Sequence, residues 1–250
     1  MKVIESIKNQ KVKDWKKLLT KKGRDKTGLF IIEGFHLVEE AMKEPNVVME
    51  LIITEQVEIP RGWNLDGVLL TKVTLDIMKA ISETEAPQGI AAICKQQNAT
   101  LTSEYKRLLL VDAVQDPGNL GTIIRTADAA GIDAIVLGNG TVDLYNGKTI
   151  RATQGSLFHL PIIKEDLRSV IPQLKQNGIS IFGTSLKNGV IYKNEPICET
   201  FALIVGNEGN GVSEEILNLT DQNLYIPIFG KAESLNVAIA SAILMYHFVK

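Results

Sequence analysis

Residues 108–249 alternate short apolar runs with stretches of helical periodicity, and this alternation restricts the fold more than any other feature of the chain. Apolar runs without polar alternation are typical of strands buried on both faces, and helices between them then cover a parallel sheet. We therefore predict an α/β domain with a ligand site beyond the carboxyl ends of its strands. The apolar runs are 108–111, 132–137, 160–163, 179–182, 201–205 and 224–228, and the helical patterns are 120–130, 167–176, 213–219 and 235–249.

The apolar and helical patterns before residue 98 predict a smaller unit that contains both strands and helices. A helix is expected over 10–20, ended by Gly23 and Gly28, and Thr74 is a suitable N-cap for a helix that runs to Ile81. The polar stretch 95–102 has no periodicity and is typical of a linker. We expect a first domain over 1–97, a linker over 98–106 and a second domain over 107–250. Further strands are expected at 29–33, 47–53, 68–70 and 90–94, and a helix at 35–43.

Composition excludes several classes of protein. Hydrophobic residues make up 45% of the 250 residues and charged residues 22%, which is ordinary for a globular chain. The two cysteines, Cys94 and Cys198, are too far apart for a zinc ribbon or a small disulfide scaffold. The apolar stretch 235–249 is too short to span a bilayer, and the charged N-terminus does not resemble a signal peptide. We expect a cytoplasmic protein without a membrane partner.

Basic residues are concentrated at the N-terminus. The net charge is −2, but residues 1–26 contain ten basic and three acidic side chains, which gives this segment a charge of +7. Such a segment could neutralise several phosphates of a nucleic acid. It could equally be a solvated helix face whose lysine stems cover apolar surface. Charge alone leaves both interpretations open.

Three loops rich in Gly and Asn follow strands of the predicted parallel sheet. In the first, 116–125 (DPGNLGTIIR), Asn119 is a plausible N-cap, and Arg125 can share the face that Asn119 overlooks. A helix N-terminus with a nearby arginine suits an anion such as phosphate. The alternative is structural: Asn119 only caps the helix, and Arg125 only pairs with Asp116 or Asp128.

The other two loops are 206–211 (GNEGNG) and 226–237 (IPIFGKAESLNV). The former is neither a phosphate-binding P-loop nor a GxGxxG dinucleotide motif, although glycines after a strand suggest close approach of the backbone to a ligand. Glu208 is either a functional carboxylate or an acid at a helix entry. In the latter loop, Ser234 is a candidate N-cap, and Asn236 either caps as well or contacts a ligand. The three histidines lie in no acidic or cysteine cluster, and no metal-binding motif occurs.

Together, in this order and spacing, the three loops resemble the three motifs of the SpoU (TrmH-like) RNA ribose 2′-O-methyltransferases of the SPOUT superfamily. The motifs fall on Asn119-Leu120-Gly121 with Arg125, on 203–212 (LIVGNEGNGV), and on Ile226-Pro227 with 234–237. The likeness covers about 108–249. Residues 30–42 (FIIEGFHLVEEAM) and 82–93 (SETEAPQGIAAI) resemble the substrate-binding domain of the family, whose fold is similar to that of RNA-binding ribosomal proteins.

The resemblance implies a parallel sheet with a C-terminal trefoil knot, a homodimer with the active site near the subunit interface, and S-adenosylmethionine as methyl donor. It implies that the donor is held by Thr184, Val205, Gly206, Ile226 and Leu235. It further implies that catalysis depends on Arg125, Asn119, Glu208, Ser234 and Asn236, with Arg125 at an RNA phosphate and the others positioning the ribose. Because a sulfonium methyl is already activated, no metal is expected. The resemblance implies that Arg125 helps to deprotonate the 2′-hydroxyl. Because arginine stays protonated in proteins, the alternative is that Arg125 fixes the adjacent phosphate and the phosphate takes the proton.

The function implied is methyl transfer to a ribose 2′-hydroxyl of RNA. The separate N-terminal domain favours ribosomal RNA over transfer RNA. Three other functions remain as alternatives: a base methyltransferase of the same superfamily, an RNA-binding or ribosome-assembly protein without activity, and a nucleotide-binding α/β enzyme. The absence of P-loop and GxGxxG patterns argues against the last of these.

Overall fold

The computed structural model describes residues 2–187 and 189–249. The chain divides into two compact units. The N-terminal unit contains Met1–Gln97 together with Tyr145–Phe158, and the C-terminal unit contains Asn98–Leu144 and His159–Lys250. We expected 145–158 in the second domain, but this segment packs with the first.

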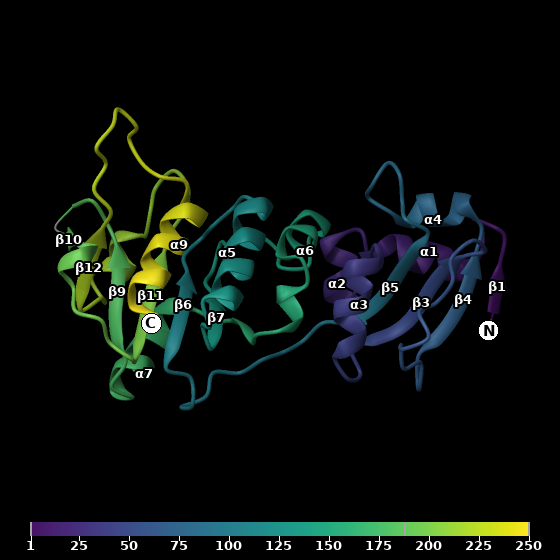
Figure 1. Cartoon of the computed structure of the whole chain (residues 1–250), viewed down its shortest axis with the longest axis horizontal. Helices are drawn as coiled ribbons and strands as arrows, with labels where there is room; N and C mark the ends of the chain where they lie inside the picture. The colour runs from purple at the N-terminus through teal and green to yellow at the C-terminus, as the bar shows by residue number, and fades with distance from the viewer. Residues whose placement is uncertain (1, 188, 250) are drawn as a thin grey trace. The chain divides into compact units, whose positions relative to one another are not determined.

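The N-terminal unit is built on a five-stranded sheet in the order β1-β4-β3-β5-β2, and Figure 1 labels β1, β4, β3 and β5 in it. Strands β1, β4 and β3 run parallel, whereas β5 is antiparallel to both of its neighbours. Helices α1 and α4 cover the sheet, and their Val12, Trp15, Ile77 and Met78 share one core cluster with Ile52. The strands are β1 (Lys2–Ile4), β2 (Leu29–Glu33), β3 (Val48–Thr54), β4 (Leu69–Val73) and β5 (Ile90–Lys95), and the helices are α1 (Gln10–Lys17), α2 (Lys21–Thr27), α3 (Phe35–Lys43) and α4 (Leu75–Ile81).

The prediction of one helix over 10–20 that Gly23 ends is wrong. Helix α1 ends at Lys17, and α2 begins after Thr20, whose side chain caps it by accepting from the Gly23 N–H. Gly23 lies inside α2, where a Cβ would be 2.0 Å from the carbonyl oxygen of Lys17. The glycine therefore allows the two helices to pack closely. Gly28, with φ of 66°, ends α2 in the left-handed conformation that suits glycine.

Residues 145–158 complete the N-terminal unit through helix α6 (Gly147–Thr153) and its flanks. The ring of Tyr145 lies 4.5 Å from that of Phe30, and its hydroxyl hydrogen-bonds both backbone groups of Gln97. Arg151 forms an ion pair with Glu83 at 3.1 Å and lies 3.5 Å from a carboxylate oxygen of Glu33. The contacts combine apolar packing with paired charges, so this segment is an integral part of the unit.

The C-terminal unit confirms the predicted parallel sheet. Its seven strands have the order β10-β12-β9-β11-β6-β7-β8, and every neighbouring pair is parallel. The residues of β11 are all buried, as the uninterrupted apolar run indicated. The strands are β6 (Arg107–Val111), β7 (Ala134–Leu137), β8 (Ile162–Lys164), β9 (Ser180–Thr184), β10 (Val190–Ile191), β11 (Phe201–Val205) and β12 (Gln222–Tyr225).

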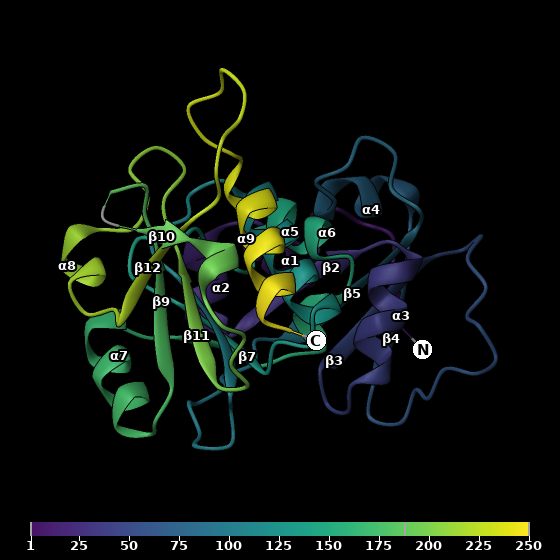
Figure 2. The ribbon, with the colours of Figure 1, turned by 60° about the vertical axis from the view of Figure 1, so that its left-hand side comes forward.

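Helices cover both faces of this sheet. On one face, α7 (Leu167–Gln176) and α8 (Glu214–Leu217) share a buried cluster with Leu108, Leu110 and Ile204. On the other, α9 (Val237–Phe248) packs through Phe248, whose ring lies 4.7 Å from Phe182 and 4.9 Å from Phe201. Helix α5 (Pro117–Ala129) lies beside α9 (Figures 1 and 2). Over the ranges that the structure describes, no helix has the length and hydropathy needed to cross a membrane.

Candidate active site

The carboxyl ends of neighbouring strands bring the three loops together. Strands β6, β11, β9 and β12 are consecutive in the sheet, and they end at Val111, Val205, Thr184 and Tyr225. Val205 pairs with Val111, and Thr184 pairs with Leu224, so these strand ends are level. The loops that follow are the ones in which polar and glycine residues are concentrated.

Asn119 lies in the first turn of α5, and it does not cap the helix. The N-cap is Asp116, whose side chain accepts a hydrogen bond from the Asn119 N–H at 2.9 Å, and Pro117 occupies the first helical position. The prediction of Asn119 as the cap is therefore wrong. An acidic cap followed by proline is a recognised helix start, so the sequence did contain the signal for Asp116.

Glu208 connects the loop after β11 to the start of α5. Its carboxylate accepts hydrogen bonds from the backbone N–H groups of Gln115 and Asp116 and from the side-chain amide of Asn119, each at 3.0 Å. Partial burial raises the pKa of Glu208, but the hydrogen bonds from Asn119, Gln115 and Asp116 outweigh it and lower the pKa below its usual value. The carboxylate therefore remains ionised and acts as an acceptor. Sequence reasoning did not identify the backbone groups of Gln115 and Asp116 as its partners.

Asn236 connects the third loop to the same network. It is the N-cap of α9, and its Oδ1 accepts from the N–H groups of Ala238 and Ile239. Its Nδ2 donates to Oδ1 of Asn119 at 2.9 Å. The prediction that Ser234 caps this helix is wrong. One continuous chain of hydrogen bonds thus joins Glu208, Asn119 and Asn236, one residue from each loop.

The loop 206–211 is shaped by contacts with its own backbone. A Cβ at Gly206 would lie 2.1 Å from the backbone nitrogen of Val212, because Asn207 and Gly211 exchange backbone hydrogen bonds just beyond it. We interpreted the glycines as a sign of close approach to a ligand, but at Gly206 the close neighbour is the loop itself. Asn207 also donates from Nδ2 to the carbonyl of Ala113, which has φ of 57°. Ala113 is thus a non-glycine residue in the left-handed backbone conformation, and strained residues of this kind occur at functional sites.

Arg125 is exposed on α5 and stands apart from the network. Six residues separate it from Asn119, which corresponds to about 120° around the helix axis and about 9 Å along it. The expectation of a shared face is therefore not met once Asn119 is inside the helix. Asp128 pairs with His159 at 2.7 Å, and within the described residues Arg125 has no acidic partner. Its guanidinium is therefore available to an anion from outside the chain.

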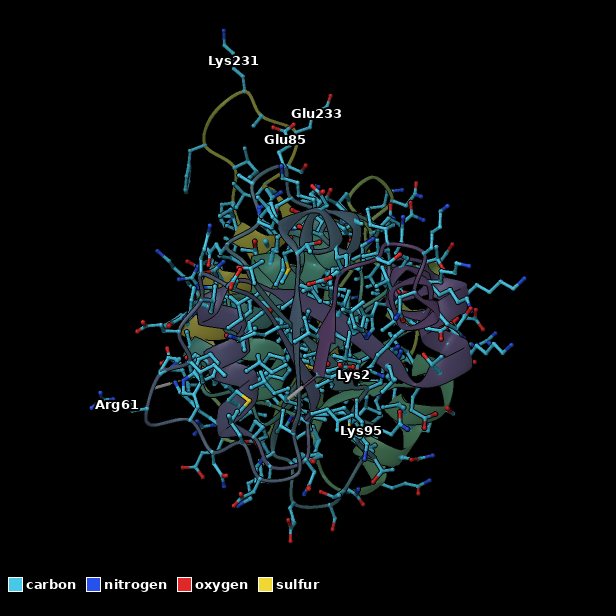
Figure 3. The ribbon with its side chains drawn as sticks, turned by 90° about the vertical axis from the view of Figure 1, so that its right-hand side faces the viewer. Lys2, Arg61, Glu85, Lys95, Lys231 and Glu233 are labelled. Atoms are coloured by element: carbon cyan, nitrogen blue, oxygen red, sulfur yellow. The ribbon has the colours of Figure 1, made fainter. Side chains whose placement is uncertain are left out.

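The third loop is extended and exposed. Ser234 lies in its exposed part, and Lys231 and Glu233 project from it into solvent (Figure 3). Residues 228–235 make no backbone hydrogen bonds within the part of the chain that the structure describes. The side chain of Phe229 is 97% exposed. This segment is therefore held mainly at its two ends, by β12 and by the cap at Asn236.

The residues expected to hold a methyl donor gather at the same strand ends. Thr184, Val205 and Ile226 end or follow the three adjacent strands β9, β11 and β12, and Gly206 follows Val205 directly. Val205 is buried, Thr184 and Ile226 are half-buried, and Leu235 is 36% exposed. These side chains carry no charge, which suits the apolar and hydrogen-bonding parts of a nucleoside better than it suits a metal or a phosphate group.

Comparisons with known proteins agree with this arrangement. The SpoU rRNA Methylase family model matches residues 106–246, and the MRM3-like substrate binding domain model matches residues 9–92. The chain is 56% identical over 247 residues, covering 99% of both chains, to the 23S rRNA (guanosine(2553)-2′-O)-methyltransferase RlmP of Bacillus subtilis. An AdoMet-bound rRNA methyltransferase structure from Sinorhizobium meliloti has a TM-score of 0.90 at 33% identity, covering 98% of this chain and 96% of that one. The AdoMet complex of the SpoU methyltransferase AviRb from Streptomyces viridochromogenes has a TM-score of 0.85 at 26% identity, covering 96% and 97%.

Proposed function

The chain belongs to the SpoU rRNA methylase family, and we propose that its target is the ribose 2′-hydroxyl of a guanosine in 23S ribosomal RNA. It is an RNA 2′-O-methyltransferase that uses S-adenosylmethionine as methyl donor. The observation that carries the choice of RNA and nucleotide is the 56% identity over 247 residues to the 23S rRNA (guanosine(2553)-2′-O)-methyltransferase RlmP. The hydrogen-bond chain Glu208–Asn119–Asn236 supports the activity, because it unites the three motif loops at one end of the sheet. A ribosomal RNA substrate would also place the enzyme in the cytoplasm.

The donor would be held by the uncharged groups at the strand ends. Thr184 and Val205 would line its pocket, and the backbone around Gly206, Ile226 and Leu235 would contact its adenosine part. When bound, S-adenosylmethionine supplies a methyl group on a positively charged sulfur, which leaves as a neutral thioether once the methyl is transferred. The rest of the reaction depends on how this chain positions the ribose, because alignment of the reacting atoms accounts for a large part of the barrier reduction.

The asparagine pair would position the ribose. Each side-chain amide has two N–H donors. Asn119 uses one toward Glu208, and Asn236 uses one toward Asn119. Each therefore keeps one donor for a ribose or phosphate oxygen, and the hydroxyl of Ser234 would supply a further contact. Glu208 acts through Asn119: the charged carboxylate fixes the amide so that its oxygen faces Asn236.

Arg125 would bind the phosphate adjacent to the reacting ribose. Because a guanidinium stays protonated, it is a poor general base. A phosphate oxygen that Arg125 holds near the 2′-hydroxyl would accept the proton instead while the C–O bond forms. The arginine then stabilises charge and orients the RNA, which matches its exposure and lack of an acidic partner among the described residues.

The homodimer is also a proposal, and α9 supports it. Nearly all of its side chains are apolar, yet Ile239 is 52% and Tyr246 is 56% exposed. Helices that are apolar on all sides are normally buried, so a second copy of the chain would cover this face. Light scattering should give twice the mass of 27.5 kDa, and Ile239→Lys should return the mass to that of one chain.

The trefoil knot that the family resemblance implies for the C-terminal part of the chain also stays a proposal. Residues 1–97 together with 145–158 would bind RNA, and 107–144 together with 159–250 would carry the reaction, with 98–106 as the linker.

A methyl-transfer assay tests the function. Wild type and Arg125→Ala are incubated with labelled S-adenosylmethionine and either unmodified 23S ribosomal RNA or bulk transfer RNA, and the product is digested with alkali. Alkaline cleavage needs a free 2′-hydroxyl, so a labelled, resistant dinucleotide from ribosomal RNA, lost with Arg125→Ala, is expected. Label only in mononucleotides would indicate a base methyltransferase. Label only in transfer RNA would overturn the substrate assignment.

A further inference from the structure

The excess of positive over negative charge in the N-terminal unit is concentrated on its first two helices. Of the ten basic residues in 1–26, eight lie on α1 and α2, which carry only Asp14 and Asp25 as acids. The rest of this unit, residues 27–97 and 145–158, has seven basic and eleven acidic side chains. The C-terminal unit has ten basic and fifteen acidic side chains. The electrostatic potential therefore favours binding of a polyanion at α1 and α2.

The hydrogen bonds divide the eight basic residues into two groups. Three are used internally: Lys11 pairs with buried Glu50, Lys17 pairs with Asp14, and buried Arg24 donates to the carbonyl of Leu18. The other five are exposed and have no acidic partner within the described residues. These five, which we call the α1–α2 lysine face, are Lys13, Lys16, Lys21, Lys22 and Lys26.

The packing of the two helices keeps these lysines outward. Val12 and Trp15 point into the core from α1, and Arg24 is buried on α2. Lys22 and Lys26 are four residues apart, so they share a face of α2. Gly23 allows α2 to approach the backbone of Lys17 closely, and Arg24 of α2 donates a hydrogen bond to the carbonyl of Leu18 at the end of α1, so the lysines of both helices belong to one compact element. Several ammonium groups on one compact element suit the repeated charges of a phosphodiester backbone better than they suit a single small anion.

Resting on the proposed function, we propose that the α1–α2 lysine face is the surface on which the N-terminal unit holds the phosphodiester backbone of the RNA substrate. Ammonium groups bind phosphates without reading bases. The face therefore supplies affinity and salt dependence, while the choice of nucleotide falls to other residues. It acts at a distance in sequence from Arg125 and the asparagine pair, so it should affect capture of RNA and leave the methyl-transfer step unchanged.

The test compares two triple variants with the same change of charge. The first is Lys16→Gln/Lys22→Gln/Lys26→Gln on the face. The control is Arg61→Gln/Lys79→Gln/Lys95→Gln, three exposed cations elsewhere in the unit, of which Arg61 and Lys95 project into solvent (Figure 3). Affinity for a 23S ribosomal RNA transcript is measured across salt concentrations, together with kcat and KM for methyl transfer and the affinity for S-adenosylmethionine. The midpoint of unfolding checks that each variant is folded.

In the face triple, the negative slope of log affinity against log salt concentration should become shallower by about 2 to 3, because fewer phosphates are neutralised. Binding at physiological salt should weaken roughly 30-fold. The KM for RNA should rise accordingly, with kcat and donor affinity within about twofold of wild type. The control triple should change the slope by less than about 1. Equal effects of the two triples would overturn the proposal. So would a face triple that binds naked RNA normally and loses affinity only for ribosomal particles, which would indicate an acidic protein partner. If the wild-type protein binds RNA through the face but methylates no RNA, the proposed function is wrong and the proposal for the α1–α2 lysine face still stands.

Discussion

The side-chain amides of Asn119 and Asn236 hydrogen-bond one another, with Nδ2 of Asn236 donating to Oδ1 of Asn119 at 2.9 Å. The two residues are 117 positions apart in the chain. One begins helix α5 and the other caps α9, so the bond fixes the starts of two neighbouring helices relative to each other. It also fixes which donors point outward. Hydrogen bonds within the chain itself therefore organise the site.

Asn119→Asp tests this organisation directly. The new carboxylate would lie against Glu208, whose Oε1 is 3.0 Å from Nδ2 of Asn119, and two carboxylates at that distance repel one another. We expect kcat to fall roughly 100-fold, with donor affinity little changed. Asn210→Asp is the matched control, because Asn210 lies in the 206–211 loop outside this network. Comparable losses in both variants would mean that added negative charge, not the lost bond, is responsible.

The titration of Glu208 should show the effect of its hydrogen bonds. Its folded pKa lies below the ordinary value of 4.5, so the carboxylate stabilises the fold above pH 4.5, and this contribution is lost as the pH falls through the folded pKa. Carbon NMR of the labelled carboxyl should give a midpoint below 4.5. In Asn119→Ala the midpoint should rise toward 4.5, because one of the donors is removed. A midpoint that does not move would show that Asn119 does not hold the carboxylate.

Arg125→Ala should separate activity from stability. Because the arginine is exposed and has no partner among the described residues, its removal should change the free energy of unfolding by less than about 0.5 kcal/mol. Methyl transfer should fall by about 100-fold or more, as expected for loss of a charge-stabilising donor. Arg168→Ala, on the opposite side of the sheet and paired with Asp166, serves as control and should keep its activity. A destabilised Arg125→Ala protein would point to a structural role instead.

Glu50 should be important for the stability of the N-terminal unit. It is buried and accepts hydrogen bonds from Lys11, from the indole of Trp15 and from the hydroxyl of Thr71, so it ties α1 to the sheet. Glu50→Gln should cost about 1–3 kcal/mol in the free energy of unfolding. Urea unfolding followed by tryptophan fluorescence measures this, because Trp15 reports on the site. Glu39→Gln, an exposed acid on α3, should change stability by less than about 0.5 kcal/mol.

Gly206→Ala tests the requirement for glycine after β11. The added methyl would meet backbone atoms of Gly211 and Val212 at 2.1–2.3 Å, and backbone cannot move aside as a flexible side chain can. A cost of about 1–3 kcal/mol and a loss of donor binding, measured by calorimetry, are expected. At Gly209 the nearest atom to an added Cβ is 3.6 Å away, so Gly209→Ala should bind the donor normally. Donor binding that survives in Gly206→Ala would exclude this loop from the donor site.

Much of the fold could be predicted because its signals are local. The uninterrupted apolar run at 201–205 indicated a buried parallel strand, and β11 occupies those residues. Helix starts were harder. Ser234 and Asn236 are both good N-caps by residue type, and periodicity does not choose between them. Asn236 is the cap in a structure where it also reaches Asn119, a contact between residues far apart in the chain.

Features that depend on distant partners were missed. Strand β1 has three residues and pairs with β4, some seventy positions later, so no pattern within it could identify it. The same holds for Glu208, whose backbone partners Gln115 and Asp116 precede it by more than ninety residues. The roles of individual site residues came from the resemblance to a family. Spacing alone did not distinguish a capping asparagine from one that positions a substrate.

Because residues 145–158 belong to the N-terminal unit, they determine where this enzyme can be divided to make chimeras with its relatives. A chimera joined at the linker would leave Tyr145 and Arg151 behind, without Phe30, Glu83 and the backbone of Gln97. The exposed aromatic and apolar surface would then favour aggregation of both fragments. A chimera designed to exchange RNA specificity between relatives must therefore exchange two separate segments, 1–97 and 145–158, together.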